Sequence, residues 1–123
     1  MPRMRITAGN IAVEAELNDS STARAIWEAL PITGRGNRWG EEIYFSIPVQ
    51  QDLAQDARAE VEVGELGYWP PGSAFCIFFG RTPASVDDQP RAASPVNPIG
   101  QVMGDATLLT QVRDGDVVTL EEA

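Results

Sequence analysis

The stretch GELGYWPPGSAFCIFFG, residues 64–80, joins an aromatic pair to an unusually apolar segment. Its later part, Ala74–Phe79, is apolar at every position and lacks the alternation of a strand that has one solvated face. We therefore expect a strand in a barrel or sandwich, covered by the core on one face and by a helix or loop on the other. The Pro-Pro-Gly sequence before it predicts a type II turn, which places Tyr68 and Trp69 at the corner that leads into the strand.

The N-terminal third predicts a hairpin followed by one helix. Met4–Ala8 and Ile11–Leu17 alternate loosely around a Gly-Asn pair, the composition of a tight turn. Good N-capping residues then occupy positions 18–21, and apolar residues recur at helical spacing from 23 to 30. The helix is expected to end near Ala29 because Pro31 disfavours helical backbone at the residue before it.

The remainder predicts short strands separated by loops. Glu41–Ile47 alternates, with Ile43, Phe45 and Ile47 on one face and Glu42, Tyr44 and Ser46 on the other. Further strands are expected at Ala59–Val63, Ile99–Met103 and Val117–Leu120, a turn at 64–67, a glycine-rich loop at 33–40 and a long irregular loop at 81–98. For 50–58 the pattern leaves a short helix and an irregular crossing open. The predicted fold is mainly β, a closed β-barrel with one or two short helices, in a single domain of residues 1–123.

The composition limits the partners and the chemistry of the chain. A net charge of -9 argues against nucleic acid and against anionic membranes, because both require clustered cations. Histidine and lysine are absent, which excludes histidine-activated nucleophiles, histidine-ligated metals and Schiff-base chemistry. The single cysteine, Cys76, lies in the apolar strand and is expected to be inert packing. No export signal or membrane span is recognised, so a cytoplasmic location is expected.

Three strings carry a resemblance to a known family: WGEEIYFSIP (39–48), GELGYWPPGSAFCIFFGRTP (64–83) and SPVNPIGQV (94–102). The chain resembles the cyclophilin-like family of small bacterial and archaeal proteins, whose members have no assigned activity. The resemblance implies a closed β-barrel with a helix at one end. The same barrel occurs in subunits of allophanate hydrolase, so the architecture does not determine the function. The Phe-His-Arg-Val motif of true cyclophilins is missing, and no catalytic residue carries over.

Aromatic rings beside Gly- and Pro-rich segments favour a pocket where a few polar groups converge. The site hypothesis is a pocket for a small molecule or peptide, without metal or cofactor, formed by Trp39, Glu42, Tyr44, Tyr68, Trp69, Arg81 and Asn97. In the competing interpretation these rings are core packing, and Glu42 and Tyr44 lie on a solvated outer face.

Two other functions stay open at this point. In a weak peptidyl-prolyl isomerase the rings would hold the proline, and Arg38 or Arg81 would donate to the twisted amide. The resemblance also implies a partner subunit of an amide-hydrolysing enzyme complex. Paired-carboxylate catalysis is not expected, because Glu41 and Glu42 are adjacent on a strand and point to opposite faces.

Overall fold

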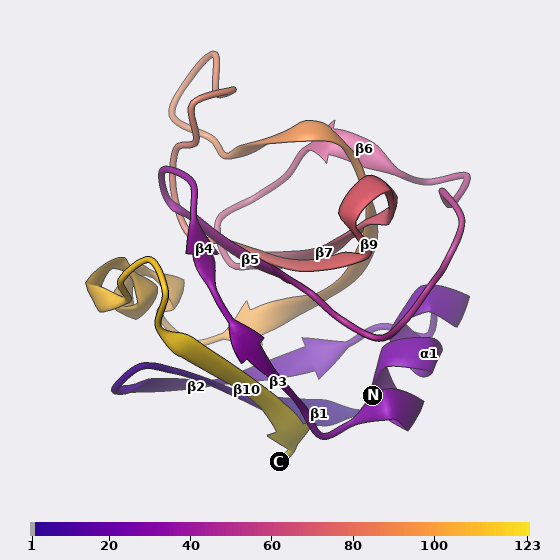
Figure 1. The fold of residues 1–123 in the computed structure, drawn as a ribbon. Helices are drawn as coiled ribbons and strands as arrows, with labels where there is room; N and C mark the ends of the chain where they lie inside the picture. Colours follow the sequence, from indigo (N-terminus) through magenta and orange to yellow (C-terminus); the bar gives the residue numbers. More distant parts are fainter. Residues whose placement is uncertain (1) are drawn as a thin grey trace.

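The computed structural model describes residues 2–123, so Met1 of the expected domain lies outside the described residues. Strands make up most of the regular structure, and the helical segments are short (Figure 1). The elements are β1 (Arg3–Ala8), β2 (Ile11–Leu17), α1 (Ser21–Ala29), β3 (Ile32–Arg35), β4 (Asn37–Arg38), β5 (Glu42–Ser46), β6 (Arg58–Glu60), β7 (Glu65–Trp69), the 3-10 helix η1 (Pro70–Gly72), β8 (Ala74–Phe78), β9 (Arg91–Met103), the 3-10 helix η2 (Ala106–Gln111) and β10 (Val117–Glu122).

The strands form an antiparallel sheet whose hydrogen-bonded order is β3-β10-β1-β2-β9-β7-β8-β5-β4, with β6 paired to β9. The order begins and ends on one chain segment, because only Gly36 separates β3 from β4 (Figure 1). β3 pairs with β10 and β4 pairs with β5, and no ladder within residues 2–123 joins β3 to β4. The fold is mainly β, as expected. The sheet is not closed into a barrel, so the predicted closed β-barrel is wrong.

Gly36 is the point at which this segment changes partner. Its N–H donates to the carbonyl of Asp116, and its carbonyl accepts from the N–H of Gly115, each at 2.8 Å. A Cβ at position 36 would lie 3.0 Å from Val118 and 3.1 Å from Ile43, so a glycine lets the chain pass closely between two packed strands. One bent segment thus supplies the strands at both ends of the hydrogen-bonded order. The predicted loop at 33–40 was wrong, since it contains β3 and β4.

The hairpin and the helix are confirmed. Pairing of β1 with β2 brings Ala8 opposite Ile11 across the turn. Helix α1 begins after Ser20, whose hydroxyl accepts a hydrogen bond from the N–H of Ala23 at 3.2 Å, as an N-cap does. Ala23 and Ile26 are buried and anchor the helix to the core.

Strand β8 is buried at all five positions, as its sequence predicted. Phe75 and Ile77 face the main core, where the ring of Phe75 lies 6.0 Å from that of Phe45. The opposite face of β8 packs in a second, smaller cluster with residues of β9 and the segment after β6. The members of that cluster are Val61, Ala74, Cys76, Phe78, Ala92 and Val96.

Strand β9 is the largest difference from the sequence prediction. Its first eight residues lie in the stretch expected to be an irregular loop at 81–98, and only 81–90 is a loop. Pro98 pairs with Gly67 at an irregularity of the β7–β9 register, where a missing N–H donor is tolerated. The expected turn at 64–67 is also replaced, because β7 starts at Glu65. The open segment 50–58 is an irregular crossing that leads into β6.

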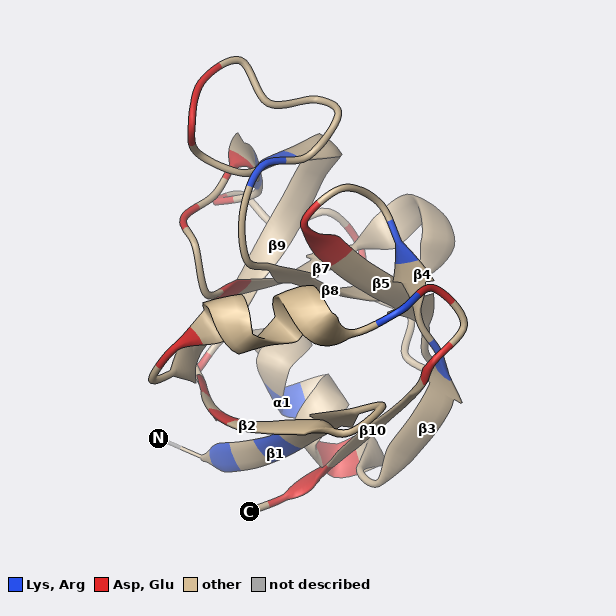
Figure 2. Cartoon of the chain, turned by 90° about the vertical axis from the view of Figure 1, so that its left-hand side faces the viewer, with Lys and Arg blue, Asp and Glu red and all other residues tan. Residues whose placement is uncertain are grey.

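Acidic residues are spread over the strands and loops, and basic residues are fewer (Figure 2). None of the helices described is long and apolar enough to cross a membrane.

Candidate functional site

A pocket of about 240 Å³ opens on the face of β5 and β8 that is turned away from the main core. Its walls are mostly aromatic and aliphatic, with one carboxyl and one thiol. The lining residues are Trp39, Glu42, Tyr44, Trp69, Cys76, Ala92, Ala93 and Val96. Apolar walls around a few polar groups are typical of small-ligand sites.

Strand alternation brings the polar groups of the pocket together. Glu42 and Tyr44 are two residues apart on β5 and therefore share a face. Tyr44 stands opposite Cys76 on β8, so the thiol is on the same side. The interpretation of this face as solvated is wrong for Glu42, which is only 5% exposed, whereas Tyr44 is half-buried.

The two tryptophans are held by specific contacts. Trp39 and Glu42 exchange backbone hydrogen bonds of 3.0 and 3.2 Å, which close the turn between β4 and β5. The indole N–H of Trp69 donates to the hydroxyl of Ser94 at 2.7 Å. A Cβ at Gly72 would come within 3.0 Å of the Trp69 ring, so η1 packs against the ring. Both residues are half-buried and line the pocket.

The environment of Glu42 changes its ionisation. Burial raises the pKa of Glu42 to about 7, and the neighbouring Cys76 thiol offsets part of that rise. Burial also raises the pKa of the Cys76 thiol, and the neighbouring Glu42 adds to the rise, so the thiol stays protonated. Among the described residues, no cation contributes to the pKa of Glu42. A carboxyl that titrates near neutrality in an apolar pocket is typical of functional sites.

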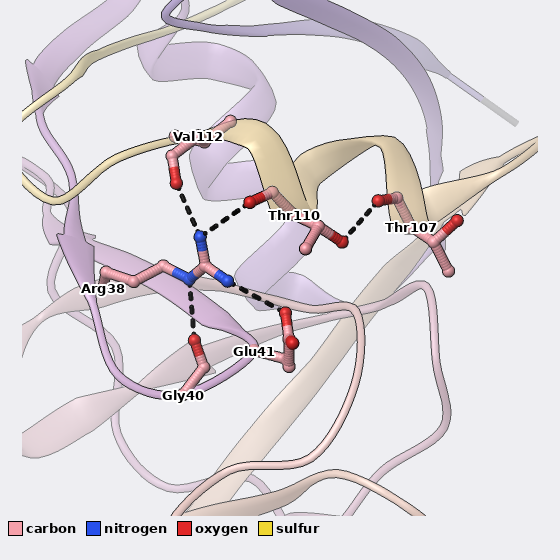
Figure 3. A network of polar contacts seen from close by, with 6 residues as sticks. All are labelled: Arg38, Gly40, Glu41, Thr107, Thr110 and Val112. Carbon is pink, nitrogen blue, oxygen red and sulfur yellow. Dashed lines mark hydrogen bonds and ion pairs between the residues drawn. The ribbon is translucent and has the colours of Figure 1, made fainter.

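Arg38 is close in sequence but is engaged on the other side of β5. Its guanidinium donates to the carbonyls of Gly40, Thr110 and Val112 and to the carboxylate of Glu41, at distances of 2.6–3.0 Å (Figure 3). The same group lies 4.9 Å from the centre of the Phe79 ring. These contacts tie the β4–β5 turn to η2, and they occupy the donors that the isomerase hypothesis assigned to Arg38.

Four of the seven predicted site residues, Trp39, Glu42, Tyr44 and Trp69, meet in the pocket. Tyr68 is fully buried, and its hydroxyl donates to the carbonyl of Val49 at 2.6 Å. Arg81 is outside the pocket, with a largely exposed side chain 3.8 Å from Asp88. Asn97 is buried beneath the segment 50–58.

The sequence prediction missed Cys76 and the β9 residues Ala92, Ala93 and Val96. A prediction that β5 pairs with β8 would have placed Cys76 opposite Tyr44, on the face of the pocket. The β9 residues carry no such signal, because alanine and valine have no chemical signature of a site.

Asn97 connects three parts of the chain. Its carbonyl oxygen accepts from the N–H of Ala54 at 2.8 Å, and its amide donates to the carbonyl of Asp52 at 2.9 Å and to the hydroxyl of Thr22 at 3.2 Å. Two backbone polar groups of an irregular segment are thus satisfied by one side chain. The function of Asn97 in this structure is to hold the crossing at 50–58 against β9 and α1.

Substitution of Asn97 with alanine is expected to lower the free energy of unfolding by about 2 kcal/mol, because three hydrogen bonds are lost and buried partners are left unsatisfied. Urea unfolding measures this change. The matched control is Asn10→Ala at the exposed β1–β2 turn, expected to change stability by less than about 0.5 kcal/mol. Equal losses in the two variants would contradict the role given to Asn97.

A larger hollow of about 740 Å³ lies over β2 and β9, but its chemistry is that of an open surface. Its lining charges Arg58 and Glu65 form an ion pair with each other. The other lining carboxylates, Glu16 and Glu62, are half-buried and exposed, whereas Glu42 in the smaller pocket is buried.

Comparison with known proteins agrees with the fold. No curated protein matches the chain. The solution structure of a hypothetical protein from Archaeoglobus fulgidus is similar, with a TM-score of 0.84 and 42% sequence identity, over 99% of this chain and 95% of that one. The family model described as cyclophilin-like matches residues 2–121. The chain therefore belongs to the cyclophilin-like family, as the three strings of its sequence predicted.

Proposed function

We propose that this protein binds a small molecule, or a side chain of a peptide, in the pocket between Trp39 and Trp69. The observation that carries the proposal is the buried Glu42 carboxyl, which faces an apolar pocket and has no cationic partner among residues 2–123. Burying such a group costs free energy, and a fold that needed only packing would place an apolar residue there. A ligand that meets the carboxyl gives a reason for its retention.

The dimensions of the pocket limit the ligand. A cavity of about 150 Å³ holds benzene, and drug-sized ligands occupy about 300 Å³ or more. The volume of about 240 Å³ lies between the two and suits a compact group with a short substituent. The rest of a larger ligand would extend into solvent at the half-buried aromatic residues.

Ala93→Phe is expected to weaken ligand binding about tenfold or more, because Ala93 is an exposed residue of the pocket wall and a phenyl group there obstructs the pocket. The measurement is an NMR titration with the neutral alcohol dimethylbutanol, followed at the indole N–H resonances of Trp39 and Trp69. The control Ala12→Phe adds the same ring at an exposed position of β2 and should bind as the unmodified protein does. Equal binding by both variants, or indole resonances of the unmodified protein that neither this alcohol nor a cation of the same shape perturbs, would overturn the proposal.

The isomerase and the partner-subunit hypotheses stay predictions from the sequence. Both arginines assigned to isomerisation have other contacts, Arg38 with Glu41 and main-chain carbonyls, and Arg81 with Asp88.

A further inference from the structure

We infer that the pocket between Trp39 and Trp69 receives an alkylated ammonium group, with the Glu42 carboxylate as its counter-charge. This inference rests on the proposed binding function and names the class of ligand for the same pocket.

The first step is the missing counter-charge of Glu42. The arginines of the surrounding elements have other carboxylates: Arg38 pairs with Glu41 at 2.9 Å, and Arg91 of β9 pairs with Glu60 at 2.6 Å. Arg81, after β8, is 3.8 Å from Asp88. A buried carboxylate without a partner is costly, so an external cation that enters the pocket replaces the hydration that Glu42 has lost.

The second step is the chemistry of the walls. Trp39, Tyr44 and Trp69 line the pocket together with Glu42. Aromatic faces attract cations through their quadrupole, and groups of such rings recognise methylated ammonium ions. The indole N–H of Trp69 is already donated to Ser94, so it offers no donor to an anionic or carbonyl ligand. Rings and a carboxylate in one wall favour a cation with an apolar surface.

The third step is the long-range charge. The chain has a net charge of -9, and acidic residues lie on several loops and strand ends (Figure 2). A negative protein attracts small cations and raises their local concentration. The same field repels anions.

The inference fixes the sign of the pH dependence. In the described part of the chain, the titratable groups that line the pocket with Glu42 are Tyr44 of β5 and Cys76 of β8; the residues from β7 and β9 are Trp69, Ala92, Ala93 and Val96. The charged neighbours Glu41, Arg38 and Arg91 are paired elsewhere. Because the pKa of Glu42 is about 7, the carboxylate that a cation needs forms as the pH rises through neutrality. Cation affinity therefore increases from pH 5.5 to pH 8.

The test compares choline with dimethylbutanol, the neutral alcohol in which carbon replaces the choline nitrogen. Both are titrated by NMR into the unmodified protein, Glu42→Gln and Glu41→Gln. At pH 8 choline is expected to bind the unmodified protein and Glu41→Gln at least about tenfold more tightly than the alcohol, and to lose that preference in Glu42→Gln. Glu41→Gln is the matched control, because the Glu41 carboxylate binds Arg38 outside the pocket.

The alternative outcomes separate this inference from the proposed function. Equal binding of the two probes at the indole resonances would overturn the ammonium assignment and leave the binding pocket standing. Absence of binding by both probes would overturn the two together. A choline preference that survives in Glu42→Gln, or that weakens as the pH rises, would remove Glu42 as the counter-charge.

Discussion

Glu42→Gln is expected to raise the free energy of unfolding by about 3 kcal/mol at pH 8 and to leave it almost unchanged at pH 4. The pKa of Glu42 rises on folding from 4.5 to about 7. Each unit of pKa change corresponds to about 1.4 kcal/mol in the free energy of unfolding. Between these two values the folded state binds more protons than the unfolded state, so the stability falls as the pH rises. Above about pH 7 the fold contains a buried carboxylate, and the full cost is present. Glutamine keeps the shape of the side chain and removes that cost.

Chemical denaturation of both proteins across this pH range measures the effect. The unmodified protein should lose stability relative to Glu42→Gln from about pH 4.5 to pH 7, with the difference constant above that range. Glu41→Gln serves as the control, since its carboxylate is half-exposed and paired with Arg38, and it should not reproduce this pH-dependent gain. A Glu42→Gln variant with the same pH profile as the unmodified protein would show that Glu42 is solvated. Glu42→Gln is expected to raise stability and abolish cation binding together, which is the trade-off between stability and function expected of a binding site.

Gly100→Ala is expected to lower the free energy of unfolding by about 3 kcal/mol or more, because β2 passes directly over this glycine. A Cβ at position 100 would lie 2.2 Å from the carbonyl oxygen of Glu16 and 3.0 Å from the Cα of Leu17. Both are backbone atoms of β2, which pairs with β9 at this point, so no side-chain rotation relieves the overlap. The strands must separate or the ladder must shift.

Gly104→Ala is the matched control for this prediction. Gly104 has a φ of +85°, and a Cβ there would meet nothing within 4 Å. Its cost is the backbone conformation alone, about 1–2 kcal/mol. Thermal or urea unfolding of the two variants separates the steric cost from the conformational one. Equal losses would contradict the close approach of β2 and β9 at Gly100.

Local sequence patterns predicted the elements whose signals are local. The Gly-Asn turn, the N-cap at Ser20 and the apolar run of β8 each describe their own segment, and the structure confirms all three. The family resemblance is confirmed as well. What the patterns could not supply is the bend at Gly36, because sharing one segment between both ends of a sheet depends on contacts with β5 and β10 that are distant in sequence.

Prolines concealed the longest strand. Pro95 and Pro98 are typical of loops. Within β9, Pro98 lies at the irregularity of the pairing with β7, and Pro95 lies in the shifted part of the pairing with β6, which only the partner strands reveal. The candidate site shows the same contrast between local signals and contacts that are distant in sequence. Alternation on β5 placed Glu42 and Tyr44 on one face, which the structure bears out. The amide of Asn97 and the hydroxyl of Tyr68 bond to the chain itself, and sequence alone does not distinguish a backbone partner from a ligand.

The most direct test of this account is an NMR titration of the Glu42 carboxyl carbon, without and with saturating choline. The account predicts a pKa of about 7 in the free protein, because the carboxyl is buried, and a lower pKa with choline, because a cation stabilises the carboxylate. A free-protein pKa at the ordinary value of 4.5, unchanged by choline, would contradict both the buried carboxyl and its role as a counter-charge.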